Sequence, residues 1–114
     1  MSGYTEPESD PDRIRRAVLS VPAVVALHGG AYEEIATYLP GRRIAGIRAD
    51  TDHVEVHVMT RYGTPLVLIG AQIREALHPV LGERTLTIAV DDILLPGQPE
   101  PDDADGPADP SSAG

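Results

Sequence analysis

The chain of 114 residues has no cysteine, tryptophan, phenylalanine, lysine or asparagine, and tyrosine is its only aromatic residue. Without cysteine there is no disulfide framework, no thiolate metal site and no thiol nucleophile. Without large aromatic residues, the core must be built from valine, leucine, isoleucine and alanine. Apolar runs stay well below the ~20 residues that span a bilayer, and the acidic N-terminus does not resemble an export signal. We therefore expect a cytoplasmic protein, brought to a membrane only through a partner.

The net charge of −9 is concentrated at the two ends. Four acidic residues precede residue 13 and five follow residue 95, whereas the body between them has nine arginines and nine acids. Ends rich in Pro, Asp, Gly and Ala bury too little surface to offset the entropy of ordering them. We predict a disordered acidic tail over residues 1–9, one α+β domain over 10–95 and a disordered Pro- and Asp-rich tail over 96–114.

Apolar spacing predicts two amphipathic helices. The first is capped by Ser9 or Asp10, has Pro11 at its first position and stops at Pro22. Its apolar stripe consists of Ile14, Ala17, Val18 and Val21. Thr64 and Pro65 are expected to open the second helix as cap and first position, Pro79 to kink or end it, and Gly82 to cap it. Its stripe consists of Leu66, Ile69, Gly70, Ile73, Leu77, Val80 and Leu81.

Period-two alternation predicts the strands. Val54, Val56 and Val58 alternate with polar residues, and residues 44–49 precede them across a short polar loop, which together indicate a β-hairpin. Residues 85–90 form a last strand. Residues 23–27 are too few to assign, and residues 31–39 are expected to form a short helix. The predicted fold is a two-layer α+β domain of helix, β-hairpin, helix and strand, with both helices on one face of a three-stranded sheet.

No reactive constellation stands out. On a strand, His53 and His57 lie ~13 Å apart, which is too far for one metal ion. His28-Gly29-Gly30 is like the oxyanion-hole turn of some esterases, but the sequence has no G-x-S-x-G nucleophile elbow. The paired acids Glu33-Glu34 and Asp91-Asp92 are expected to be solvated. We therefore predict a protein that is not an enzyme and needs no metal or cofactor.

Protein–protein contact is the favoured function class. Val67 and Leu68 lie off the main stripe of the second helix, and the sheet face away from the helices should present polar residues and Met59. The adjacent Arg42 and Arg43 could together hold a phosphate or a carboxylate. The predicted interaction surface comprises Arg42, Arg43, His53, Glu55, His57, Met59, Val67 and Leu68.

A family resemblance supports this class. Residues 35–66 read IATYLPGRRIAGIRADTDHVEVHVMTRYGTPL, and residues 90–94 read VDDIL. With the stretch from Val21 to Gly30, this order resembles the alkaline-shock / general-stress envelope protein family, particularly its short actinobacterial members, over most of residues 13–95. The resemblance implies a cytosolic, non-enzymatic scaffold of the envelope stress response, which self-associates and gathers at the membrane through a separate anchoring protein. It offers no catalytic residues, and this chain departs from it at VLIG, residues 67–70, where relatives place polar residues.

The alternative is an RNA- or phosphate-binding small domain with a KH-like order of elements. Arg42 and Arg43 would then have to form one patch with Arg48 and Arg61. The missing G-x-x-G clamp and the neutral body count against this alternative.

Overall fold

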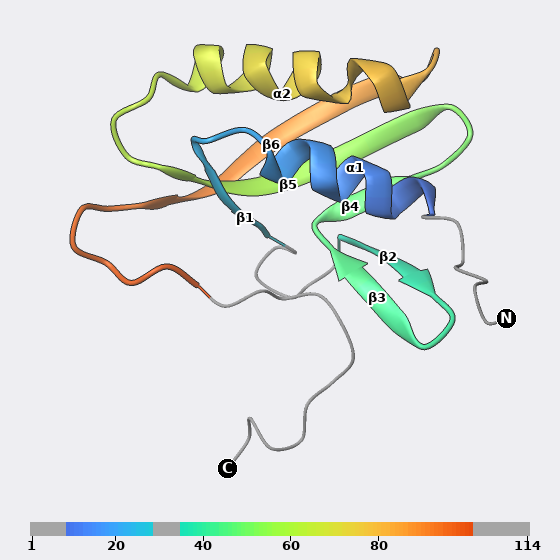
Figure 1. The fold of residues 1–114 in the computed structure, drawn as a ribbon, viewed down its shortest axis with the longest axis horizontal. Coiled ribbons are helices and arrows are strands. Elements are labelled where there is room, and N and C mark those ends of the chain that lie inside the picture. The colour runs from blue at the N-terminus through green and yellow to red at the C-terminus, as the bar shows by residue number, and fades with distance from the viewer. Residues whose placement is uncertain (1–8, 29–34, 102–114) are drawn as a thin grey trace, which may run out of the picture.

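The computed structural model describes residues 9–28 and 35–101. Figure 1 shows the helices and strands of this part. In chain order they are α1 (Asp10–Leu19), β1 (Val24–Leu27), β2 (Ala36–Leu39), β3 (Arg42–Ala45), β4 (Ile47–Ala49), β5 (His53–Arg61), α2 (Leu66–Leu81) and β6 (Thr85–Leu94). The predicted α+β class is confirmed.

The long strand β5 is the centre of a four-stranded sheet. On one side it pairs antiparallel with β1 along its C-terminal half and with β4 along its N-terminal half. On the other side it pairs in parallel with β6, from His53 opposite Thr85 to Arg61 opposite Leu94. Parallel neighbours require a crossover connection, which α2 provides. Strands β2 and β3 form a separate two-stranded sheet.

Both helices pack on one face of the four-stranded sheet, as the alternation of valines predicts. That face presents Val54, Val56 and Val58, all fully buried. From the helices, the same core receives Ile14, Val18, Ile69, Ile73 and Leu77. Leu86, Ile88 and Val90 of β6 are half-buried and pack against this cluster. The core is therefore the aliphatic one that the composition requires.

The start of α1 is fixed by Ser9, one of the two caps predicted. The Asp12 N–H donates to Ser9 Oγ at 3.2 Å, and the Asp12 carboxylate accepts the Ser9 N–H in return, which completes a capping box. Pro11 lies in the first turn, where a backbone N–H has no helical partner to lose.

The start of α2 differs from the prediction. Pro65 itself is the N-cap residue, and no side chain in the described part of the chain caps the helix, so Thr64 does not have the predicted role. The Pro65 carbonyl instead accepts the N–H groups of Leu68 and Ile69, both at 3.1 Å. The first turn of α2 is thus held by its backbone alone.

The end of α2 agrees with the prediction at Gly82. This residue caps the helix with a φ of 67°, a conformation that glycine adopts without strain. Pro79 lies inside the helix and does not end it, since α2 continues to Leu81. Pro79 cannot donate the N–H that would bond to the carbonyl of residue 75, and α2 continues for only two residues beyond it.

The predicted hairpin is confirmed, but its first strand is interrupted. Asp50 Oδ1 accepts the N–H groups of Asp52 and His53 at 3.0 and 2.9 Å, which closes the turn between β4 and β5. Residues 44–49 do not form one strand, because Gly46 separates β3 from β4 with a φ of 82°. The chain passes there from the small sheet to the large one.

Two other segments correct the sequence-based assignment. Residues 36–39 are strand β2 rather than part of a helix, and the Thr37 hydroxyl donates to the Ile47 carbonyl at 2.6 Å. The Pro40-Gly41 turn pairs β2 with β3, and this pairing outweighs the weak helical spacing. Residues 31–34, the rest of the predicted helix, lie outside the described residues. The unassigned run before His28 is strand β1, which raises the main sheet from three strands to four.

The predicted tails fall mostly outside the described residues, at 1–8 and 102–114. Within 9–28 and 35–101, neither helix combines the length and apolar character needed to cross a bilayer.

Candidate functional site

The structure places the eight residues of the predicted interaction surface in three separate regions. Four of them lie on the face of β5 that points away from the helices: His53, Glu55, His57 and Met59. Arg42 and Arg43 lie on β3 of the small sheet. Val67 and Leu68 lie in the first turn of α2. A single surface containing all eight does not exist.

The open face of the sheet is organised around His57. Its Nε2 lies 2.6 Å from Glu55 Oε2, and its Nδ1 lies 2.7 Å from Asp91 Oδ2. The side chain is only 15% exposed, so it is less solvated than the sequence suggests. Arg48 approaches the other Glu55 oxygen at 3.6 Å, and His28 approaches Asp91 at 3.7 Å. These five side chains form a polar network that joins β4, β5, β6 and the residue that follows β1.

The network sets the protonation state of His57. Burial alone would lower the pKa of His57, but the hydrogen bonds to Glu55 and Asp91 outweigh burial and raise the pKa above its usual value. A neutral imidazole carries one N–H and could donate to only one of the two carboxylates. Both carboxylates therefore favour the protonated imidazolium form of His57, in which each ring nitrogen donates to one carboxylate.

His53 is part of a different contact. Its two ring nitrogens contact the hydroxyls of Thr85 and Thr87 on β6, so it is joined to neutral groups rather than to His57. Among the described residues, no group of three His, Cys, Asp or Glu side chains is arranged to hold a metal ion. The two described serines bond locally, Ser9 to Asp12 and Ser20 to Ala17, far along the chain from His57.

Asp91 is the site residue that sequence reasoning misjudged. It was expected to be ordinary solvated charge, and the residue is exposed, but its carboxylate is bonded to His57. The alternation that places Thr85 and Thr87 on the open face extends by parity to position 91, and that signal was present in the sequence. The register between β5 and β6 shifts after Val58, because Val58 lies opposite Val90 and Met59 lies opposite Asp92. Asp91 is therefore an extra residue of β6.

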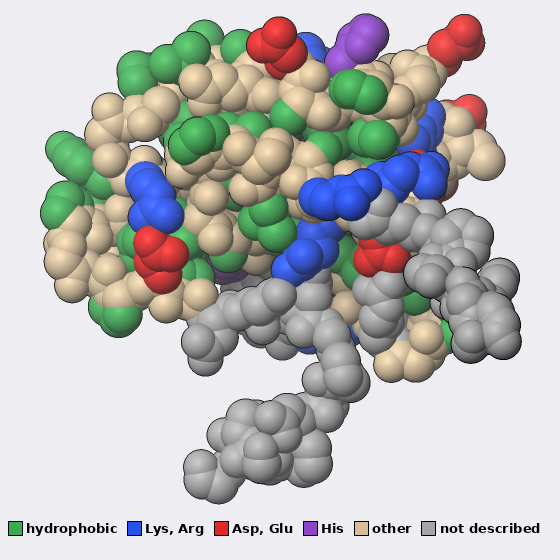
Figure 2. Space-filling view, in the orientation of Figure 1, with side chains coloured by type: hydrophobic (Ala, Val, Ile, Leu, Met, Phe, Trp, Pro, Cys, Tyr) green, Lys and Arg blue, Asp and Glu red, His purple; other side chains and the backbone are tan. Residues whose placement is uncertain are grey.

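The arginines proposed for a phosphate site do not form one patch. Arg48 pairs with Glu55 on the open face of the sheet. Arg61 lies at the far end of β5 and pairs with Glu100 at 2.7 Å. Arg43 lies on another sheet. Figure 2 shows that the visible basic side chains mostly lie over α1 and beside it.

The most exposed apolar surface lies at the end of the fold where β5 and β6 finish and α2 begins. The parallel pairing brings these segments together, and the Tyr62 N–H donates to the Leu94 carbonyl at 3.0 Å. Val67 is 88% exposed, the largest value among the exposed large hydrophobic residues. We call this surface the end patch; it consists of Tyr62, Leu66, Val67, Leu68, Ile93 and Leu95. In Figure 2, hydrophobic side chains line this end of the molecule.

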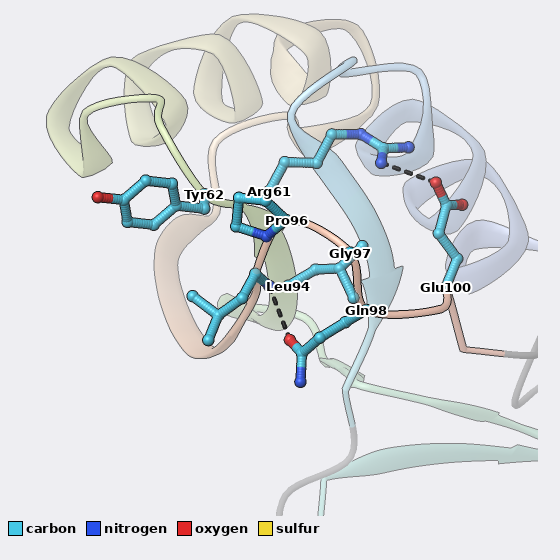
Figure 3. A pocket seen from close by; sticks show the side chains of 8 residues that line it. Arg61, Tyr62, Leu94, Pro96, Gly97, Gln98 and Glu100 are labelled. Carbon is cyan, nitrogen blue, oxygen red and sulfur yellow. Dashed lines mark hydrogen bonds and ion pairs between the residues drawn. The ribbon is translucent and has the colours of Figure 1, made fainter.

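Two shallow hollows accompany the end patch. Figure 3 shows one of them, where Tyr62 and Pro96 lie on one side and the Arg61–Glu100 pair lies on the other. The second hollow lies between Tyr62, Leu66 and Ile93 and reaches Thr60. Thr60 is fully buried, and its Oγ1 has no hydrogen-bond partner within the described part of the chain. Such an unpaired buried hydroxyl is uncommon in native proteins.

Comparison with protein-family models, with curated proteins and with solved structures found no match for this chain. The resemblance to the alkaline-shock / general-stress envelope family stays a prediction.

Proposed function

We propose that the protein is a non-enzymatic interaction module, which acts by contact with another protein and by self-association. The observation that carries the proposal is the end patch, where six large apolar side chains are exposed together. Scattered apolar side chains are ordinary on a soluble surface, whereas a grouped set is typical of a contact site.

Two features of the end patch favour protein contact over ligand binding. The hollows beside it are open and shallow rather than enclosed, so they suit a partner's side chains better than a buried small molecule. Arg61 and Glu100 border the patch with opposite charges, an arrangement like the polar rim of a protein interface.

The chemistry of the open sheet face also favours a module that is not an enzyme. His57, at the centre of the network, has both nitrogens bound to carboxylates, and no hydroxyl or thiol nucleophile contacts it among the described residues. By extension of the family resemblance, we propose that the partner is a membrane-anchoring protein and that the module works in the cytoplasm during envelope stress.

A site-specific cross-linking experiment tests the proposal. A photo-reactive residue replaces Val67, and a matched control replaces Glu75 on the exposed side of the same helix. We expect a discrete protein adduct in cells from position 67, absent from position 75, and lost when Leu68→Glu is added. Equal labelling from both positions would refute the end patch as a contact surface.

A further inference from the structure

The outer edge of β6 is the second surface that the fold leaves without a partner. β6 pairs with β5 along one side, and no other described strand pairs with it. The Thr85 N–H donates to the Asp52 carbonyl at 3.0 Å, so the backbone of Thr85 points toward β5. Because backbone direction alternates along a strand, the N–H and C=O groups of Leu86, Ile88 and Val90 point outward.

The first six residues of this edge have none of the features by which proteins block unwanted strand pairing. Residues 85–90 read TLTIAV, without a charge or a proline, and the bulge comes only at Asp91. Natural edge strands are usually short, charged, bulged or covered. A flat, uncharged edge of six residues, in a chain that is 24% charged, is therefore suited to accept another strand.

We propose that a second copy of this chain covers the edge, with the two β6 strands antiparallel about a twofold axis at Ile88. The proposal rests on the self-association in the proposed function and names its surface. Leu86 then lies opposite Val90 of the other copy and Ile88 lies opposite Ile88. Each of these pairs exchanges two backbone hydrogen bonds.

Charge selects this register over its neighbours. Centred on Ile88, the pairing places Asp91 opposite Thr85, with no acid facing an acid. A shift that sets Thr87 opposite itself brings Glu83, in the turn just before β6, toward Asp91, and like charges close to each other are destabilising. A shift that sets Ala89 opposite itself places Asp92 opposite the apolar Leu86.

The same arrangement adds contact beyond the strands. A twofold axis perpendicular to the joined sheet keeps the helices of both copies on one side. The helix α2 packs on the half-buried side chains of β6, so the two α2 helices would become neighbours over the axis. Leu86, Ile88 and Val90 would gain cover that one copy does not give them.

Disulfide trapping reads the register directly, since the chain has no cysteine of its own. In the proposed register Thr87 faces Ala89 of the other copy as a non-hydrogen-bonded pair, with Cα atoms about 4.5 Å apart, which a disulfide spans. Full-length Thr87→Cys and Ala89→Cys are oxidised separately and as a mixture. We expect a covalent dimer from the mixture only. Self-linking of either variant alone would overturn the register.

Sedimentation equilibrium provides the second readout. Thr87→Lys with Ala89→Glu places opposite charges across the axis and should sediment as a dimer, whereas Thr87→Lys with Ala89→Lys should bind itself roughly tenfold more weakly. Far-UV circular dichroism verifies that both variants fold. A wild-type chain that stays a monomer at millimolar concentration and gives no trapped dimer would overturn the proposal. If the cross-linking experiment still gave adducts from position 67, the proposed role of the end patch would hold without this dimer.

Discussion

Replacing Gly46 with alanine is the sharpest test of how the fold holds its sheet together. Gly46 has a φ of 82°, and its N–H donates to the Ile35 carbonyl at 2.7 Å. A Cβ on this residue would lie 2.8 Å from the His28 nitrogen, 2.9 Å from the His57 oxygen and 2.9 Å from the Leu27 Cβ. Two of these three atoms belong to the backbone of neighbouring strands. They cannot move without disturbing the His28 N–H to His57 carbonyl bond of 2.8 Å.

The expected magnitude has two parts. The positive φ costs alanine about 1–2 kcal/mol, partly offset by about 0.4–1 kcal/mol because alanine makes the unfolded chain less flexible. The close contacts add about 1–3 kcal/mol of overpacking. Gly41 isolates the first part, because its φ is 80° and no atom of the described residues lies within 4 Å of its Cβ position. Gly46→Ala should therefore lose about 1–3 kcal/mol more than Gly41→Ala.

Urea unfolding followed by far-UV circular dichroism measures this difference, and a native far-UV spectrum verifies that each variant folds. Because φ is nearly the same at the two sites, the strain and the unfolded-state terms cancel in the comparison. Equal losses in the two variants would show that the strands yield at Gly46, and would refute the close packing of β1, β4 and β5 described above.

Four further changes are predicted. Gly70→Ala should stabilise the protein by about 0.5–1 kcal/mol in urea unfolding, because Gly70 is inside α2 and no atom of residues 9–28 or 35–101 lies within 4 Å of its Cβ position. A loss of stability would contradict the open surface there. Thr60→Val should add about 1 kcal/mol by removing an unpaired buried hydroxyl, and no gain would mean that Oγ1 is bonded. Folding raises the pKa of His57, so the stability that the protonated imidazole provides is full below about pH 6.5 and is lost as the pH rises through the folded-state pKa. If the stability of His57→Gln depended on pH in the same way as that of the wild type, this would contradict the network. The Arg84 guanidinium donates to Asp10 Oδ2 at 2.8 Å, and this hydrogen bond lowers the pKa of the Asp10 carboxyl. Asp10→Asn should therefore lose about 1 kcal/mol of stability near neutral pH. The difference from the wild type should shrink as the pH falls through the lowered pKa.

Much of the fold follows from the period of the sequence. The valine alternation in β5 and the stripes of the two helices place the core correctly, because long periodic segments specify both their type and their buried face. The short segments do not. β1 and β2 have four residues each, and over that length an apolar run is compatible with a helix or a strand. Their identity is decided by pairing with β5 and β3, which no local pattern contains.

The site shows the same division between local and long-range information. Parity along β5 predicts that His53, Glu55 and His57 share one face. It does not predict that Glu55 and Asp91 bind opposite nitrogens of His57, since Asp91 comes from another strand and is inserted by a bulge. The exposure of Val67 and Leu68 was readable from the helix stripe. The end patch was not, because Ile93 and Leu95 join it only through the parallel pairing of β5 and β6.

Amide hydrogen exchange along β6, measured by NMR at several protein concentrations, tests most directly whether this chain works through its uncovered edges. In a single copy the Thr85 amide is bonded to β5, whereas those of Leu86, Ile88 and Val90 point to solvent. Self-pairing predicts that exchange at these three amides slows as the concentration rises, while exchange at Thr85 stays slow throughout. Equally fast exchange at the three amides in dilute and concentrated samples would contradict the account.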